Sequence, residues 1–142
     1  MKNHVILTIV AIAIVAVFLI GCGDRPFTNI RNNNISSVEV QYGTVTVRGS
    51  TRSTMIQVYG YSYRIENFEM YITVYLARTP RTPEERRITR RTPSVEFVSA
   101  LPNHVERIFI EDNRHAILIW ERSQGYGEFD IEEHWREKIS KL

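Results

Sequence analysis

The sequence predicts an all-β domain, a small antiparallel sandwich of immunoglobulin-like architecture that ends in a short amphipathic helix. Short apolar runs with period-2 alternation recur between residues 38 and 121, and turn-forming residues separate them. Helical spacing of apolar residues occurs only near the C terminus of the domain. No β-α-β alternation interrupts the strands, and the Cys-Trp-Cys pattern of true immunoglobulin domains is absent. The prediction therefore concerns the architecture, with a small open barrel as the alternative.

The first strand region contains two sets of alternating apolar residues. They occupy residues 38–42 and 44–47 and fall on opposite parity across Gly43. One inserted residue reverses the parity of a strand, and glycine is often that residue. We therefore predict a single long strand with a bulge at Gly43, and a tight hairpin at the same glycine is the alternative.

Residues 55–65 and 68–77 are predicted to form a hairpin through a Glu66-Asn67 turn. Arg64 then opposes Glu69, which supplies a cross-strand ion pair on one face of the sheet. The same register gathers three tyrosines on the other face, where we expect core packing rather than a binding role. These tyrosines are Tyr59, Tyr61 and Tyr63.

Residues 95–99 predict a short strand, and a second hairpin follows it. Its strands are residues 105–111 and 115–121, joined by an Asp112-Asn113 turn. Aspartate and asparagine tolerate the positive φ that such a turn requires.

The C-terminal residues change to helical spacing. Asp130 can cap a helix, with Glu133 as a capping-box partner three residues later. Two favourable i,i+4 ion pairs, Glu132 with Arg136 and Glu137 with Lys141, support the same helix. Its expected buried stripe consists of Ile131, Trp135, Ile139 and Leu142.

The first twenty residues have the organisation of an export signal. Residues 1–4 are polar and include the positive Lys2, and the next sixteen residues are apolar apart from Thr8. A helix needs about 20 residues to cross the hydrocarbon core of a bilayer, so a cleaved signal peptide fits better than a spanning helix. An uncleaved membrane helix and an ordinary secretory signal are the alternatives.

The apolar run ends in Leu19-Ile20-Gly21-Cys22, which contains the only cysteine of the chain. This ending resembles the lipobox of bacterial lipoproteins. The resemblance covers residues 1–22 and implies that signal peptidase cleaves before Cys22, whose Sγ carries a diacylglyceryl thioether and whose amino group receives an acyl chain such as palmitate. It also implies an extracytoplasmic protein, anchored by lipid to the cell membrane or the outer membrane.

Removal of residues 1–21 from the 142-residue chain leaves 121 residues, enough for one domain. Residues 22–37 are polar without periodicity and predict a flexible tether, and residues 38–142 predict a single β domain with its helix from about residue 130. The net charge of +2 is too small to indicate a nucleic-acid partner. With Cys22 lipidated, no thiol remains for a disulfide.

Residues 78–93 read RTPRTPEERRITRRTP and carry six arginines against two glutamates. Prolines block ladder hydrogen bonds, so the segment predicts a projecting loop. Guanidinium groups bind phosphate bidentately, which suggests capture of an anionic envelope component. The alternative is a solvated connection that keeps the sheet soluble. The candidate ligand-binding residues are Arg78, Arg81, Arg86, Arg87, Arg90 and Arg91.

The sequence offers no catalytic residues, metal site or cofactor motif that we can identify. His104, His115 and His134 share no metal-ligand spacing, and no Gly-x-Ser-x-Gly motif occurs. The preferred interpretation is a non-enzymatic, lipid-anchored binding module for an envelope component or a protein partner. A small envelope hydrolase or inhibitor and a structural assembly subunit are the alternatives.

Overall fold

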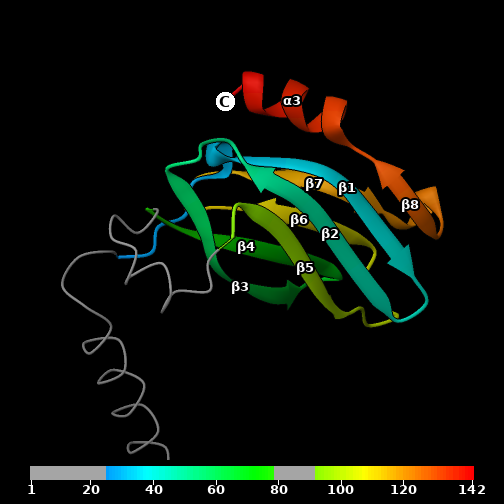
Figure 1. The fold of residues 1–142 in the computed structure, drawn as a ribbon. Helices are drawn as coiled ribbons and strands as arrows, with labels where there is room; N and C mark the ends of the chain where they lie inside the picture. Colours follow the sequence, from blue (N-terminus) through cyan, green and yellow to red (C-terminus); the bar gives the residue numbers. More distant parts are fainter. Residues whose placement is uncertain (1–24, 79–91) are drawn as a thin grey trace, which may run out of the picture.

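Two four-stranded sheets stack face to face in the computed structural model, which describes residues 25–78 and 92–142 (Figure 1). A short helix, α3 (Glu132–Ser140), follows the last strand. The first sheet contains, in spatial order, β5 (Ser94–Ala100), β2 (Thr44–Thr51), β1 (Asn33–Gln41) and β8 (Gly127–Asp130). The second sheet contains β3 (Ile56–Glu66), β4 (Glu69–Arg78), β6 (Arg107–Glu111) and β7 (Ala116–Glu121).

The predicted sandwich with a terminal helix is confirmed, and β5 includes the short strand predicted at residues 95–99. Buried residues alternate along the strands of both sheets, so apolar contacts between the inner faces hold the sheets together. One strand pair departs from an antiparallel arrangement, because β4 and β6 run parallel. Between β4 and β6, the chain crosses to the first sheet and forms β5. It then returns to the second sheet, where Arg107 at the start of β6 pairs with Glu69 at the start of β4. The buried core includes Val38, Val40, Val45, Val47, Met70, Ile72, Leu76, Ile108 and Ile110.

The single long strand predicted across Gly43 is wrong, and the alternative hairpin is present. Gln41 pairs with Thr44, so Tyr42-Gly43 forms a two-residue turn in which Gly43 has a φ of 79°. Opposed residues of a hairpin lie on the same face of the sheet. Across a two-residue turn, inward-facing residues therefore change from even to odd positions, as they also do across a bulge. The alternation of apolar residues therefore fits both arrangements.

The first predicted hairpin is present, but its turn lies one residue later than expected. Glu66 pairs with Glu69, and the turn residues Asn67-Phe68 both have positive φ. The register therefore shifts by two residues, which keeps side chains near the turn on their expected faces. The predicted pairing of Arg64 with Glu69 is wrong, since Arg64 lies opposite Tyr71, with its guanidinium carbon 4.1 Å from the ring centroid.

The second hairpin shows the same displacement. Glu111 pairs with Ala116, and the Asp112 N–H donates to the His115 carbonyl oxygen at 2.9 Å, so the turn is Asn113-Arg114. The Asp112 carboxylate accepts from two backbone N–H groups beyond it, those of Arg114 at 2.8 Å and His115 at 2.7 Å. An aspartate that caps the turn in this way stands before it rather than within it.

The predicted tether over residues 22–37 is wrong for the part that the structure describes. Phe27 and Leu76 exchange two backbone hydrogen bonds, of 2.9 and 2.8 Å. The 3-10 helix η1 (Ile30–Asn32) follows, and Ile30 is only 1% exposed. Its N–H donates to Asp112 Oδ2 at 2.9 Å. Residues 25–37 therefore belong to the domain.

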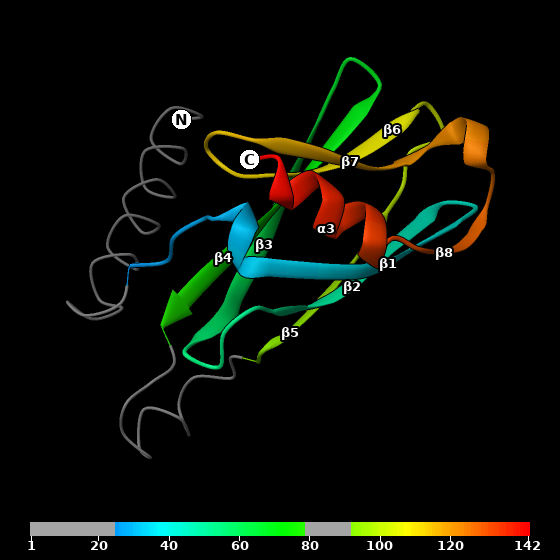
Figure 2. The same cartoon turned by 90° about the horizontal axis from the view of Figure 1, so that it is seen from above.

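The helix α3 closes one side of the sandwich, where it lies beside β1 and β7 (Figure 2). Trp135 is fully buried and its Nε1–H donates to the Asn33 carbonyl oxygen at 2.9 Å. His134 Nε2 lies 2.9 Å from the Leu118 carbonyl oxygen, so the helix bonds to both sheets. Both predicted ion pairs are present. Of the predicted stripe, Ile131, Trp135 and Ile139 are buried, whereas Leu142 is 38% exposed.

Candidate functional site

Residues 25–27, the end of β4 and the start of β5 lie at one end of the sandwich (Figure 1). Phe27 pairs with Leu76 near the end of β4, and the Val58 N–H donates to the Thr92 carbonyl oxygen at 2.8 Å just before β5. In Figures 1 and 2 the first described residues, the end of β4 and the start of β5 lie on the same side of the molecule. The described residues at the two ends of the arginine-rich segment, Arg78 and Thr92, therefore lie at the same end of the sandwich as residues 25–27.

Exposed arginines gather at this end, which we call the arginine end. Arg25 precedes Phe27, Arg31 lies within η1, and the Arg52 N–H donates to the Asn32 carbonyl oxygen at 2.8 Å. Of the predicted ligand-binding residues, Arg78 is described and is exposed at the end of β4. The arginine end is defined by Arg25, Arg31, Arg52 and Arg78. Cys22, Arg81, Arg86, Arg87, Arg90 and Arg91 lie outside the described residues.

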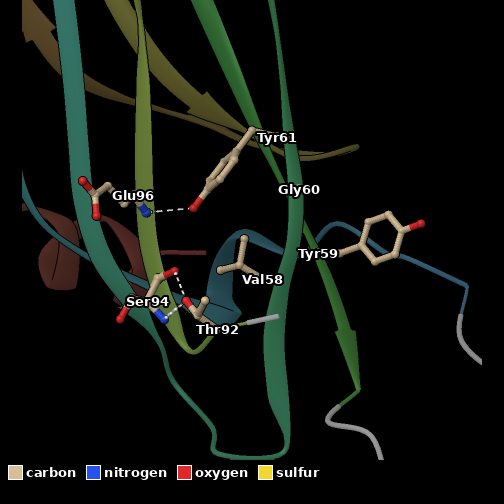
Figure 3. A pocket seen from close by; sticks show the side chains of 7 residues that line it. All are labelled: Val58, Tyr59, Gly60, Tyr61, Thr92, Ser94 and Glu96. Atoms are coloured by element: carbon tan, nitrogen blue, oxygen red, sulfur yellow. Dashed lines mark hydrogen bonds between the residues drawn. The ribbon is translucent and has the colours of Figure 1, made fainter. Parts of the chain in front are cut away.

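A notch of about 270 Å³ lies between the outer edges of β3 and β5 (Figure 3). Tyr61 reaches across from β3, and the Glu96 N–H donates to its Oη at 2.7 Å. Tyr59 points away from the notch, and Val58 points into it. Thr92 and Ser94 hydrogen-bond to each other at its lower end. The notch therefore lies between two hydrogen bonds that join the sheets, one between Val58 and Thr92 and the other between Tyr61 and Glu96.

The Tyr61 hydroxyl is the central polar group of the notch. Burial raises the pKa of Tyr61 above its ordinary value, the charge of Glu96 adds to this rise, and the backbone hydrogen bond partly opposes it. The phenol is therefore protonated at neutral pH. Its oxygen accepts from the Glu96 N–H, which leaves the O–H as a donor for a small polar ligand.

A second hollow, of about 490 Å³, lies between β7, β8 and α3. Glu121, Glu128 and Asp130 contribute carboxylates to its lining. His134 also lines it, but its Nε2 is engaged by the Leu118 carbonyl oxygen. Among the described residues, no three His, Cys, Asp or Glu side chains are grouped to hold a metal ion.

The core packing predicted for Tyr59 and Tyr63 is wrong, because both rings are exposed, whereas Tyr61 is partly buried and packs against the core. All seven tyrosines of the chain are described, and none is buried. Tyr63 is 49% exposed and meets Phe97 edge-on, and Tyr61 also contacts Phe97. The buried core consists of aliphatic side chains together with Trp120, Trp135 and Phe97, and the rings of Tyr59 and Tyr63 lie outside it.

His104, His115 and His134 lie in separate places. His104 meets the Phe68 ring edge-on at 6.1 Å, and His115 Nδ1 is 3.6 Å from the Asp112 carboxylate. Within residues 25–78 and 92–142, no helix has the length and hydropathy needed to cross a membrane. Comparisons with protein-family models, curated proteins and solved structures give no match to this chain.

Proposed function

We propose that the protein is a lipid-anchored binding module of a bacterial envelope, and that its arginine-rich segment engages an anionic component of that envelope. The observation that carries the proposal is the pairing of Phe27 with Leu76. This pairing brings the chain that follows Cys22 beside the strand end from which residues 78–93 depart. The proposed anchor and the basic segment thus share one end of the domain.

The distance along the chain favours close approach to the membrane. Phe27 lies five residues after Cys22, and an extended chain of that length spans about 17 Å at most. The Debye length at physiological salt is about 8 Å, so exposed charges act on a surface only within such short distances. A lipid on Cys22 would hold the arginine end within reach of headgroups or other surface anions.

The lipid chains and the arginines would contribute to membrane binding in different ways. Each buried CH₂ of a lipid chain contributes about 0.8 kcal/mol, and two or three chains hold a protein firmly on a bilayer. Each basic residue near an anionic surface contributes about 1 kcal/mol, and this attraction weakens with salt. The lipid therefore sets attachment, and the arginines set orientation and the choice of anionic surface.

The experiment is sedimentation of the domain lacking its lipid with anionic vesicles at low and at physiological salt. Replacement of Arg86, Arg87, Arg90 and Arg91 by glutamine should weaken binding by two to three orders of magnitude, at about 1 kcal/mol per residue. Equal sedimentation of this variant and the unmodified domain would refute a binding role for the segment.

A matched control separates position from total charge. Glutamine at four arginines elsewhere removes the same charge but should leave vesicle binding nearly unchanged. Their side chains are 43–63% exposed and form surface ion pairs, which contribute little to stability. These control positions are Arg48, Arg64, Arg107 and Arg136.

A further inference from the structure

Each sheet has a strand at either edge, and two of these edge strands are protected from pairing with another chain. Natural proteins protect such edges by short strands, charges, bulges or a covering segment. β8 is four residues long and carries Glu128 and Asp130. α3 lies beside β7, where His134 Nε2 is 2.9 Å from the Leu118 carbonyl oxygen. The other two edge strands are β3 and β5.

The edges of β3 and β5 are partly closed by hydrogen bonds. The Val58 N–H donates to the Thr92 carbonyl oxygen at 2.8 Å, and the Glu96 N–H donates to Tyr61 Oη at 2.7 Å. The Ser94 N–H donates to Thr92 Oγ1 at 3.0 Å. These bonds protect β5 as far as Glu96, and they protect β3 as far as Val58, just before its bulge.

Beyond the bulge, β3 has an edge without a partner strand. Glu66 pairs with Glu69 across a two-residue turn, so Glu66 and every second residue before it bond to β4. The residues between them direct their backbone N–H and C=O groups away from β4. Within residues 25–78 and 92–142, no backbone hydrogen bond from another strand reaches these groups. We call this the free edge and define it by Tyr61, Tyr63 and Ile65.

The charge that could protect the free edge is held away from it. Arg64 is the charged residue between Tyr61 and Ile65, and its guanidinium carbon lies 4.1 Å from the centroid of the Tyr71 ring on β4. Its Nε and Nη2 donate to the two carboxylate oxygens of Glu111 on β6, both at 3.1 Å. The positive charge is therefore drawn across the sheet and neutralised there. Residues 56–66 also contain no proline, which would block strand pairing.

Apolar groups border the free edge on the inner side of the sheet. Tyr61 and Tyr63 both pack against Phe97 of β5, with ring centroids 5.7 and 6.0 Å from it. Tyr63 is nevertheless 49% exposed, and Ile65 is only partly buried. A strand added to this edge would place alternate side chains beside these groups, since opposed residues share a face. Near Tyr61 it would reach the notch of about 270 Å³, which has room for a side chain (Figure 3).

A second copy of the chain does not fit this edge when both copies are anchored. β3 begins where Ile56 pairs with Arg78 at the arginine end, and it runs to the opposite end of the sandwich. Antiparallel pairing of two free edges would therefore place the two arginine ends at opposite ends of the joined sheet. Parallel pairing would turn the inner face of one sheet to the side of the other's outer face. Two copies held by lipid in one membrane surface cannot adopt the first arrangement, and the second leaves the rings uncovered.

We infer that the free edge binds an extended segment of another envelope protein, with apolar side chains at alternate positions. The N–H and C=O groups of that segment would pair with the free edge and supply affinity, and its alternate side chains would supply selectivity. The exclusion of a second copy rests on the proposed anchor. The free edge itself does not depend on it.

The test is amide hydrogen exchange of the full chain in neutral detergent micelles, measured by NMR, with a capped heptapeptide of alternating valine and threonine. Saturating peptide should slow exchange of the Tyr61, Tyr63 and Ile65 N–H groups at least tenfold, because strand pairing protects an amide from water. The same peptide with N-methylated amides cannot donate hydrogen bonds and should have no effect. No protection of the free edge, or protection only of Val98 and Ala100 on β5, would overturn the inference.

Tyr63→Lys separates binding from folding. It places a positive charge beside the incoming strand, which is how many natural edges prevent pairing. The apparent Kd for the heptapeptide should rise at least tenfold, while the thermal midpoint falls by no more than a few degrees because the ring is half exposed. Tyr42→Lys is the matched control, since Tyr42 is 76% exposed on the β1–β2 turn. Its Kd should stay within a factor of two of the unmodified chain, and an unchanged Kd in Tyr63→Lys would contradict the inference.

Self-association would assign the free edge differently. If sedimentation equilibrium shows a dimer that Tyr63→Lys abolishes, a second copy occupies the edge and the inference is overturned. The exchange experiment uses the unmodified chain, so it decides the question even where Tyr63→Lys is unstable. Failure of the proposed function is seen separately, as a free Cys22 thiol or as vesicle binding that does not depend on the arginines.

Discussion

The two long sides of the sandwich are closed in different ways. On the side beside β1 and β7, the helix α3 covers the gap between the sheets and buries Trp135 and Ile139. On the other side, the edges of β3 and β5 are joined by two hydrogen-bonded bridges, Val58 with Thr92 and Tyr61 with Glu96. We call these the sealed side and the open side.

The difference shows where the stability of the domain resides. Burial of a large apolar side chain contributes about 1.5–3 kcal/mol or more, whereas one hydrogen bond contributes a net 0.5–1.5 kcal/mol. The sealed side therefore stabilises the fold, and the open side can vary with less cost. Substitutions on the sealed side should therefore lower the free energy of unfolding more than substitutions on the open side.

The largest effect is expected on the sealed side. Trp135→Ala removes a fully buried indole and leaves the Asn33 carbonyl oxygen without its donor, so the free energy of unfolding should fall by about 3–5 kcal/mol. Denaturant unfolding measures this loss. Trp135→Phe is the control and should retain much of the stability. An unchanged unfolding midpoint in the alanine variant would show that the helix does not close the sandwich.

A smaller effect is expected where Asp112 ties the N-terminal residues to the β6–β7 turn. Burial alone would raise the pKa of Asp112, but the backbone N–H groups of Ile30, Arg114 and His115 outweigh it and lower the pKa below its ordinary value. Asp112→Asn places an amide NH₂ against one of these donors. The free energy of unfolding at pH 7 should therefore fall by about 1–3 kcal/mol.

The pH dependence follows from the lowered pKa of Asp112. The ionised carboxylate stabilises the folded state at pH values above the ordinary carboxyl pKa of about 3.9, and this stabilisation is lost as the pH falls through the lower folded-state pKa. The difference in unfolding free energy between the unmodified chain and Asp112→Asn should shrink over that acidic range. A difference that stays constant from pH 7 to pH 2 would contradict the assignment.

The smallest effect is expected on the open side. Tyr61→Phe keeps the ring against Phe97 but removes the acceptor of the Glu96 N–H, so the unfolding free energy should fall by only about 1 kcal/mol. Thermal unfolding measures the change. A loss as large as that of Trp135→Ala would mean that the open side is as firmly closed as the sealed side.

The hairpins show how far the sequence determines the fold. Alternation identifies which side chains face the core, because a two-residue shift leaves each face unchanged. It does not locate the turn, which depends on local hydrogen bonds such as those of the Asp112 carboxylate. The alternation around Gly43 was likewise compatible with both a bulge and a tight hairpin. The N-terminal residues pack without periodicity, because Phe27 and Ile30 enter the domain as isolated apolar residues and not as an alternating series.

The candidate surfaces were less predictable than the fold. The basic residues 78–93 stand out in the sequence because six arginines fall within sixteen residues. The bridge from Tyr61 to Glu96 joins residues 35 positions apart in different sheets, and no local pattern marks it. Phe68 was not expected in the turn, because the sequence predicted that turn one residue earlier.

The intact mass of the protein recovered from the membrane fraction of a bacterial host tests the lipid anchor most directly. We expect a chain that begins at Cys22 and carries a diacylglyceryl group, with or without a further acyl chain, and we expect no lipid on the Cys22→Ser variant. Recovery of the unmodified protein in the membrane with a free Cys22 thiol would contradict the lipid anchor, and with it the proposed position of the arginine end beside the membrane.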